Sequence, residues 1–387
     1  MTNNINRRSF LRNSAIAAAG VALTGSYACS STQTETKNKL PRWKGFNLLD
    51  LFSPEPPQNP EGGSLTTEDD LKWMADWGFD FVRIPMAYPR YLSFDRSGDI
   101  TKDEVLNYDP SVLEQVDNLI SMANKYNLHV SLNLHRAPGY CINAGFHEPF
   151  NLWKDKEAQD AFNAHWGMWA ERYKGISSDK LSFDLLNEPA YIEDMNDQYA
   201  QKVTVPGETY RKVILGASEA IRSASPERLI IADGNNVGND PTPEITDLNI
   251  AQSCRGYWPG LISHYQASWV WKDPSQAPTP VWPGNIDGKY YGREQLEEYY
   301  KPWIDLKDRG IGVHCGECGC YSKTPHNVFL AWFGDVIDIL TSAGIGFALW
   351  NFRGSFGILD SGRTDIEYTD WHGHKLDSKL LTLLQRK

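Results

Sequence analysis

The sequence predicts an α/β fold of the (β/α)8 TIM-barrel type, built as one catalytic domain with extended loops after the strands. Strand-like runs alternate with longer amphipathic helical patterns along the chain, and this alternation implies a parallel sheet. The runs number eight, which is the number of strands that closes such a barrel. The chain has 387 residues, and this length suits a single barrel with long loops, which takes roughly 200 to over 400 residues.

Each predicted strand is a short run rich in β-branched, aromatic or other apolar residues, and turn signals follow it. Several runs are continuously apolar, as expected of strands that are covered on both faces. In chain order the predicted strands are 43–49, 81–85, 129–135, 181–188, 229–234, 251–257, 311–317 and 346–352.

The predicted helices lie between these strands and carry apolar residues at helical spacing along one face. Such a helix packs its apolar face on the outside of the barrel and exposes its polar face to water. The predicted helices are 67–77, 110–126, 156–173, 207–223, 293–309 and 327–343.

Composition limits the kinds of partner that this protein can have. Hydrophobic residues make up 41% of the chain, so it can bury a sizeable core. A net charge of -11 and a pI near 5.3 disfavour nucleic acid and anionic membranes, because neither rewards an acidic surface. The 14 Trp and 18 Tyr residues exceed what a core needs, and their rings suit the apolar faces and hydroxyl edges of sugars. Aromatic core packing is the alternative, and it is expected to explain at least half of them.

Residues 1–28 are expected to be an export signal rather than part of the fold. Arg7 and Arg8 precede a weakly apolar run, which resembles a bacterial twin-arginine signal. That run, 15–23, is shorter than the about 20 apolar residues that span a bilayer. Cys29 stands where a lipoprotein cysteine would be acylated, so lipidation and ordinary cleavage nearby remain alternatives.

The rest of the chain divides into a polar tether, 29–40, and the predicted barrel domain, 41–387. Export by the twin-arginine route implies a periplasmic or outer-membrane lipoprotein, or a secreted protein. Membrane contact is expected only through a lipid anchor at Cys29, and the protein is expected to be a monomer.

The cysteines do not predict a disulfide framework or a metal site. Five cysteines follow Cys29, and an odd number leaves at least one thiol unpaired. Cys315, Cys318 and Cys320 have metal-like spacing, but no second Cys/His pair at finger spacing completes four ligands. Small buried residues beside a catalytic strand end are the favoured interpretation, with zinc as the alternative.

Polar residues collect at the carboxyl-terminal ends of the predicted strands. In a barrel these ends converge on one face, where the active site is built. The residues concerned are Arg83, His135, Arg136, Asn187, Glu188, Glu317, Trp350 and Asn351. One shared site explains this pattern better than separate surface accidents.

Glu188 and Glu317 close the fourth and seventh predicted strands, each after an apolar run. A lone Glu after a strand usually makes a surface salt bridge, but two on one barrel face can flank a glycosidic bond. One carboxyl group is then protonated to help the leaving oxygen depart, and the other is ionised to attack the anomeric carbon. This chemistry needs no metal or organic cofactor.

These segments resemble glycoside hydrolase family 5, within the larger clan of barrel glycosidases. The Asn187-Glu188-Pro189 tripeptide is the most specific element, and the resemblance covers essentially residues 41–387. The supporting segments follow in family order: GFDFVRIP at 78–85, LNLHR at 132–136, GECG at 316–319 and ALWN at 348–351.

The resemblance implies a role for each matching residue. Glu188 would be the acid/base and Glu317 the nucleophile, which Arg83 would keep ionised. Asn187 would bond the sugar 2-hydroxyl, a contact that strengthens toward the transition state. His135 would line the subsite of the reacting sugar, and Trp350 would form its floor.

One departure concerns the family's His-x-Tyr near the sixth strand. Tyr257 matches, but Arg255 stands where His is expected; an alternative register uses His264, directly followed by Tyr265. An arginine close to the acid/base would lower its pKa, which hinders a proton donor unless the charge is engaged elsewhere. Substrate preference is therefore expected to differ from that of the family's common cellulases and mannanases.

Two loops are expected to wall the active-site face. The first is 137–153, and the second, 258–291, contains Trp258, Trp269 and two further tryptophans. Such loops stack extra sugars or close one end of a cleft, so endo and exo action both remain open.

The sequence therefore predicts a retaining hydrolase of β-glycosidic bonds that works by double displacement on a glycan or oligosaccharide. Transglycosylation on the same scaffold is one alternative. A non-catalytic surface glycan-binding protein is another, because Arg255 breaks a family position.

Overall fold

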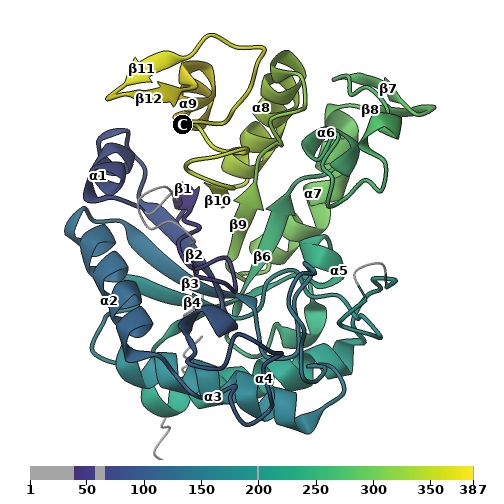
Figure 1. Cartoon of the computed structure of the whole chain (residues 1–387). Coiled ribbons are helices and arrows are strands. Elements are labelled where there is room, and N and C mark those ends of the chain that lie inside the picture. The colour runs from purple at the N-terminus through teal and green to yellow at the C-terminus, as the bar shows by residue number, and fades with distance from the viewer. Residues whose placement is uncertain (1–38, 57–65, 198–199, 387) are drawn as a thin grey trace, which may run out of the picture. The chain divides into compact units, whose positions relative to one another are not determined.

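Eight parallel strands close into a barrel in the computed structural model of the chain, which confirms the predicted fold (Figure 1). Every predicted strand is present. In chain order the strands are β1 (Lys44–Asn47), β2 (Phe81–Ala87), β3 (His129–Arg136), β4 (Leu181–Asp184), β5 (Leu229–Asp233), β6 (Ala251–Gly256), β9 (Val313–Cys318) and β10 (Gly346–Leu349). The barrel closes where β1 pairs with β2 on one side and with β10 on the other.

Burial explains why these runs form strands. Every residue of β2 and β3 is buried, as expected of strands with side chains inside the barrel on one face and helices on the other. Gly45 on β1 marks a close approach, because a Cβ atom there would lie 1.6 Å from the carbonyl oxygen of Phe81. Only glycine fits at this pairing.

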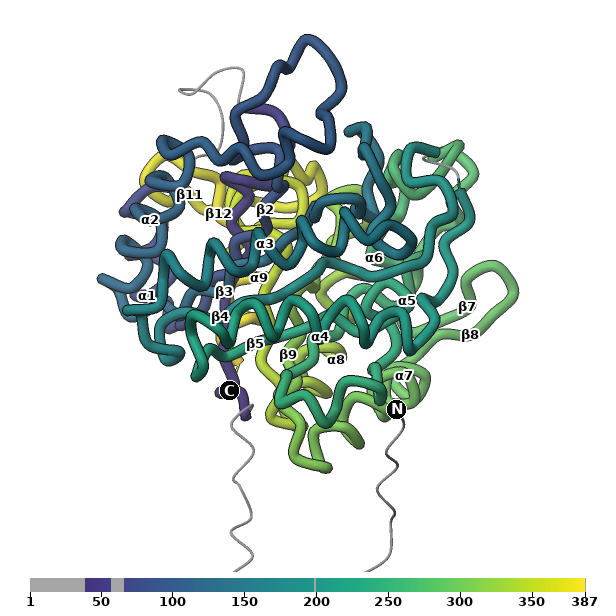
Figure 2. Tube along the Cα trace, turned by 90° about the horizontal axis from the view of Figure 1, so that it is seen from below, coloured from purple at the N-terminus to yellow at the C-terminus, as the bar shows by residue number. Residues whose placement is uncertain are grey.

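The six predicted helices are also present and surround the barrel. They are α1 (Glu68–Asp76), α2 (Pro110–Lys125), α3 (Lys156–Arg172), α4 (Gly207–Ala224), α7 (Arg293–Asp308) and α8 (His326–Ser342). Figure 2 shows α3 and α4 running side by side along the barrel. Local signals set two helix starts: Thr67 and Asp70 form a capping box for α1, and Asp109 caps α2 ahead of Pro110.

The structure also contains short elements that the sequence did not predict. They are α5 (Asn235–Gly238), α6 (Gly260–Ser263), α9 (Ser378–Leu384), the hairpins β7–β8 (Gly284–Ile286, Lys289–Tyr291) and β11–β12 (Thr369–Trp371, His374–Leu376), and 3-10 turns at Tyr88–Tyr91, Pro243–Ile245 and Pro274–Gln276. All of them except the seven-residue α9 have three or four residues, which are too few to show a strand or helix period. The hairpin β7–β8 and α6 lie within the predicted loop 258–291.

Five predicted strands extend past the observed carboxyl-terminal ends, and two of them do so by three or four residues. The run 181–188 was predicted as one strand, but β4 ends at Asp184. Glu188 has a φ of 47°, a left-handed conformation that cannot continue a strand. Likewise, β10 ends at Leu349, before Trp350. These residues therefore stand on turns above the barrel rather than inside it.

The structure describes residues 39–56, 66–197 and 200–386. The predicted export signal 1–28, Cys29 and all but the last two residues of the predicted tether lie outside the described residues. Within the described ranges, no helix combines the length and the apolar character that a membrane crossing needs.

Candidate active site

The carboxyl-terminal ends of the strands bring the predicted site residues together. Hydrogen bonds, ion pairs and ring contacts join them into one cluster. Arg83 lies on β2, His135 on β3, Arg255 on β6 and Glu317 on β9, while Asn187 and Glu188 follow β4, Tyr257 follows β6 and Trp350 follows β10.

Glu317 is buried, with 3% of its surface exposed, and it accepts contacts from three donors. Arg83 Nη1 lies 2.6 Å from Oε1, and the Tyr257 hydroxyl donates to Oε2 at 3.2 Å. Arg255 Nη2 lies 3.5 Å from Oε1. Burial and the neighbouring Glu317 raise the pKa of Tyr257 well above its ordinary value, so the phenol keeps the proton that it donates. These contacts stabilise a negative charge on Glu317.

Arg83 is the fixed cation beneath Glu317. Its Nε donates to Asp184 at 2.7 Å and its Nη2 to the amide oxygen of Asn187 at 2.9 Å, while Nη1 also reaches Asn47 at 3.1 Å. Burial opposes the charge of Arg83, but Asp184 and Glu317 outweigh it and raise the pKa of the guanidinium. The side chain is therefore a permanent positive charge with every nitrogen engaged.

The backbone of Glu188 is held on both sides. Its N–H donates to Asp233 Oδ2 at 2.8 Å, and its carbonyl oxygen accepts the Tyr140 hydroxyl at 2.6 Å. The Tyr140 hydroxyl in turn accepts the N–H of Ala190 at 2.8 Å. These contacts maintain the left-handed backbone of Glu188 and direct its side chain, which is 15% exposed, toward Arg255.

The environment of Glu188 favours its protonated form. Burial and the negative charge of Glu317 raise its pKa to about 7, and the charge of Asp233 acts in the same direction. Arg255 works against this shift, since its Nε donates to Glu188 Oε1 at 2.9 Å. The two glutamates therefore lie in contrasting environments, one rich in donors and one that retains a proton near neutral pH.

Arg255 lies between the two glutamates, so the register with Tyr257 is the one whose side chains reach them. It comes close to Glu188, as the sequence analysis considered, yet the pKa of Glu188 is raised rather than lowered. Burial and the charge of Glu317 outweigh Arg255, and the charge of Asp233, a residue that sequence reasoning missed, acts in the same direction. Asp233 Oδ1 accepts Arg255 Nη1 at 3.1 Å, and Oδ2 accepts Nη2. Asp233 thus engages the charge of Arg255.

Asn187 is oriented by both arginines. Its Oδ1 accepts Arg83 Nη2 at 2.9 Å and Arg255 Nη2 at 2.8 Å. These donors require the oxygen on their side, so the amide nitrogen points away from them. That nitrogen is buried and has no hydrogen-bond partner among the described residues. It is available to donate to a ligand hydroxyl.

Aromatic rings form one wall of the site. The Trp350 ring stacks on His135 with centroids 5.5 Å apart, and Phe52 contacts Trp350 at 5.3 Å and His135 at 4.6 Å. Burial, together with Arg83 and Arg255, holds the pKa of His135 well below its ordinary value. His135 is therefore a neutral ring that can line an apolar sugar face. Phe52 is a further residue that sequence reasoning missed.

For two predicted substrate-binding residues, His264 and Trp258, the structure shows contacts with other aromatic rings. The His264 ring contacts the ring of Tyr257 at 5.0 Å, and burial lowers its pKa to about 4, so it supports Tyr257 as a neutral neighbour. The Trp258 ring stacks on Tyr299 of α7 at 5.2 Å and contacts Tyr291 at 5.7 Å. The structure thus shows Trp258 packed on α7 rather than in contact with either glutamate.

The cysteines are buried thiols, as the favoured interpretation expected. Cys315, Cys318 and Cys320 are each 0% exposed and unpaired, like Cys141 and Cys254. Cys315 Sγ contacts the carbonyl oxygen of Glu317 at 3.3 Å, and Cys318 Sγ that of Ala348 at 3.3 Å. In the described ranges no group of three or more His, Cys, Asp or Glu side chains is placed to hold a metal ion.

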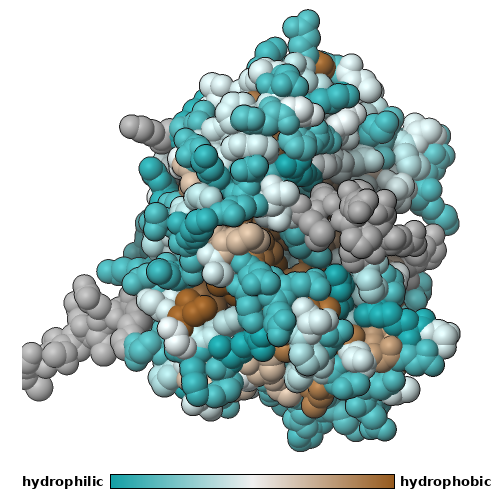
Figure 3. All heavy atoms as spheres, turned by 60° about the vertical axis from the view of Figure 1, so that its left-hand side comes forward, coloured by the Kyte–Doolittle hydropathy of each residue, from teal (hydrophilic) through white to brown (hydrophobic). Residues whose placement is uncertain are grey.

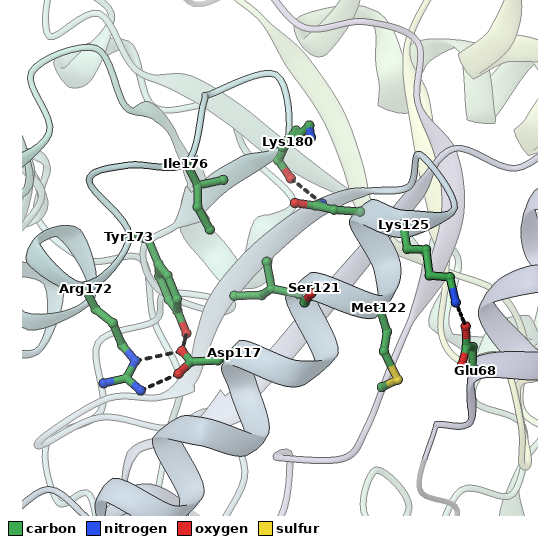
Figure 4. Close-up of a pocket in the computed structure, with 11 residues that line it drawn as sticks. Glu68, Asp117, Ser121, Met122, Lys125, Arg172, Tyr173, Ile176 and Lys180 are labelled. Carbon is green, nitrogen blue, oxygen red and sulfur yellow. Dashed lines mark hydrogen bonds and ion pairs between the residues drawn. The ribbon is translucent and has the colours of Figure 1, made fainter.

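A large surface hollow lies apart from this cluster. It measures about 950 Å³ and is lined by residues of α1, α2 and α3 and of the segment before β4 (Figure 4). Arg172 pairs there with Asp117, and Lys125 with Glu68. On the face shown in Figure 3 the surface is mostly hydrophilic, and hydrophobic residues gather in a recess near its middle. The chemistry of the strand ends, not the size of a hollow, identifies the site.

Comparison with known proteins agrees with the fold. The cellulase (glycosyl hydrolase family 5) model matches residues 31–355. Endoglucanase C of Acetivibrio thermocellus is 26% identical over 349 residues, which cover 84% of this chain and 92% of that protein. Cellodextrinase A of Ruminococcus flavefaciens is 26% identical over 320 residues, which cover 78% of this chain and 83% of that protein.

Solved structures share the same barrel. A crystal structure of a glycoside hydrolase is 39% identical, with a TM-score of 0.78 over 89% of this chain and 98% of that chain. The family match spans most of the sequence and includes both glutamates. The chain therefore belongs to glycosyl hydrolase family 5 and is an O-glycosyl hydrolase.

Proposed function

We propose that this enzyme hydrolyses β-linked glucans or cello-oligosaccharides with retention of configuration, using Glu317 as nucleophile and Glu188 as acid/base. The observation that carries the proposal is the shared contact with Arg255: its Nε touches Glu188 and its Nη2 approaches Glu317. Two carboxyl groups on one guanidinium are close neighbours, and a short separation is what a retaining glycosidase needs. The names of the endoglucanase and cellodextrinase relatives support the substrate class.

In the first step, a carboxylate oxygen of Glu317 attacks the anomeric carbon. The bond to the leaving oxygen breaks, and the Glu188 proton passes to that oxygen. The amide nitrogen of Asn187, which has no partner among the described residues, would donate to a hydroxyl of the reacting sugar. Trp350 and His135 would pack against that sugar's apolar face.

In the second step, water attacks the anomeric carbon of the glycosyl-enzyme. Glu188 takes a proton from the water, and the ester bond to Glu317 breaks to release the carboxylate. Glu317 carries no charge while it is esterified. One cause of the raised pKa of Glu188 is then absent, which favours the ionised form needed for a base.

A substrate panel with stereochemical analysis tests the proposal. Purified enzyme is incubated with aryl β-glycosides and with β-1,4-glucan, β-1,3-glucan and β-mannan, and the first-formed anomer is followed by proton NMR. Hydrolysis that first yields the β anomer is the expected result. An initial α anomer would exclude retention. Glycan binding without cleavage would favour the binding-protein alternative, and dominant transfer to sugar acceptors would favour the transglycosylase.

The activity is expected to fall as the pH rises through about 7, because Glu188 must carry a proton in the first step. The protonated fraction of Glu188 is complete below its pKa and is lost above it, so this group sets the alkaline limb. The measurement is the pH dependence of kcat/KM on an aryl β-cellobioside whose leaving group needs protonation. A profile that stays flat through the alkaline range would contradict the assignment.

Trp269 is proposed to contact a sugar unit beyond the reacting one. It is 56% exposed, and the centroid of its ring lies 4.8 Å from that of Tyr321 and 6.3 Å from that of Phe356. The Phe356 ring also contacts Tyr257, at 6.2 Å, so an aromatic surface leads from Glu317 to Trp269.

Replacement of Trp269 by alanine is expected to lower kcat/KM on long oligosaccharides about three- to tenfold, if a ring on a sugar face contributes as much as an aromatic pair does, about 0.5–1.5 kcal/mol. An aryl monoglycoside should be almost unaffected. Tyr290→Ala is the matched control, because Tyr290 is 53% exposed on the β7–β8 hairpin. If kcat/KM fell equally on short and long substrates, Trp269 would not contact a more distant sugar unit.

The enzyme is also proposed to act outside the cytoplasm. The paired Arg7 and Arg8 support twin-arginine export, and Cys29 is a candidate site for lipidation. Replacement of both arginines by lysine should retain the enzyme in the cytoplasmic fraction. Export of that variant at the normal level would reject this route.

A further inference from the structure

We propose that Asp233 and Arg255 act together as a positioning pair that controls both the orientation and the protonation of Glu188. This inference rests on the proposed function and concerns two residues outside its bond-making and bond-breaking steps. Arg255 stands where the family resemblance implied a histidine, so the resemblance does not supply the role of the pair.

The geometry is a closed ring of contacts around Glu188. Asp233 Oδ2 accepts the Glu188 N–H at 2.8 Å and also accepts Arg255 Nη2. Arg255 Nε then donates to the Glu188 side chain at 2.9 Å. One aspartate therefore fixes the backbone of Glu188 directly and its carboxyl group through the guanidinium. Both members are buried, since Asp233 is 0% and Arg255 1% exposed.

The charges explain why both members are needed. A buried guanidinium alone beside Glu188 would favour the carboxylate and prevent proton donation. Asp233 offsets that charge with both of its oxygens. Arg255 can then donate a hydrogen bond that orients Glu188, whether Glu188 is protonated or ionised. The proton affinity of Glu188 meanwhile stays suited to an acid near neutral pH.

Groups from several strand ends face Glu188, and the charges that act on it most strongly are those of Glu317, Arg255 and Asp233. The titratable groups around Glu188 are Glu317 on β9, Arg255 and Tyr257 at β6, Asp233 on β5, Arg83 on β2, Asp184 on β4, and His135, Tyr140 and Cys141 at or after β3. Arg83 forms ion pairs with Asp184 and Glu317. His135 is neutral, and Tyr257 and Tyr140 keep their protons.

The test compares the alkaline limb of kcat/KM in Asp233→Asn and Arg255→Gln enzymes. Asp233→Asn removes a negative charge and frees that of Arg255, so the limb should move to lower pH by about one unit. Arg255→Gln removes the positive charge, so the limb should move to higher pH by a similar amount. Opposite shifts are expected only if the charges of the pair control Glu188.

Ser253→Ala is the matched control. Ser253 Oγ accepts Arg255 Nη1 at 3.1 Å, so this change removes a hydrogen bond from the same guanidinium without removing a charge. Its alkaline limb should coincide with that of the wild type. In the Asp233→Asn/Arg255→Gln double variant one charge of each sign is lost, and the limb should return toward the wild-type position.

A purely structural salt bridge would give a different outcome. Loss of such a bridge would lower the melting temperature of both single variants and leave the alkaline limb of kcat/KM in place. That result would overturn the inference. If one single variant does not fold, the other still decides the question, because each has its own predicted direction. A wild-type enzyme that cleaves no glycoside would instead refute the proposed function.

Discussion

Replacement of Glu317 by alanine is expected to lower kcat on aryl β-glycosides by about five orders of magnitude. Losses on this order follow removal of a nucleophile that forms a covalent intermediate, and they correspond to about 7 kcal/mol of barrier. The loss should be this large because Glu317 receives Arg83, Tyr257 and Arg255 as donors, a set that no other carboxyl group shares among the described residues.

Azide distinguishes loss of the nucleophile from loss of the fold. A small anion can occupy the space left by the Glu317 side chain and attack the anomeric carbon from the same side. The product is then an α-glycosyl azide from a β-glycoside, which is inverted. Recovery of activity with this product identifies Glu317 as the nucleophile, while recovery without any azide adduct would contradict the assignment.

The variant is expected to fold. Arg83 keeps Asp184 and Asn187, and Arg255 keeps Asp233, so neither guanidinium is left without a carboxylate. Some loss of stability is expected nonetheless, because a buried charged partner has been removed. Thermal unfolding of Glu317→Ala beside the isosteric Glu317→Gln measures that loss separately from the kinetics.

Much of the fold and the central site could be predicted because both depend on local patterns. Continuous apolar runs identify strands covered on both faces, and amphipathic patterns identify the helices between them. Topology then places polar residues at strand ends together. Arg83, Glu188 and Glu317 were accessible from the sequence for this reason.

The rest depends on tertiary contacts that no local pattern contains. Asp233 lies one residue before the end of the predicted strand 229–234 and is the last residue of β5, but its importance comes from Arg255 on the neighbouring strand. Trp258 lies in a loop beside the site, and only the structure shows its ring against Tyr299 on α7. The signal for Asp233 was a carboxylate at a strand end, combined with an arginine where histidine was expected.

Replacement of Glu188 by alanine is expected to give losses that depend on the leaving group. For an alkyl or sugar leaving group, which must be protonated, kcat/KM should fall about 10³- to 10⁴-fold, near the upper end of what general acid catalysis contributes. For a dinitrophenyl glycoside, which departs without a proton, kcat/KM should change little. Comparison of kcat/KM across aryl glycosides of graded acidity measures this dependence.

With Glu188→Ala, azide is expected to give a product of the opposite configuration to that from Glu317→Ala. The two experiments together assign the roles of the two glutamates. With Glu188 absent, the glycosyl-enzyme on Glu317 still forms but lacks a base to activate water. Azide needs no base, so it should accelerate turnover and yield a β-glycosyl azide of retained configuration. The site of Glu188 is open enough for the anion, since its side chain is 15% exposed against 4% for Glu317. If Glu188→Ala gave a glycosyl azide of inverted configuration, the roles of Glu188 and Glu317 would have to be exchanged. If the loss of kcat/KM did not depend on the leaving group, Glu188 would not be the residue that transfers the proton.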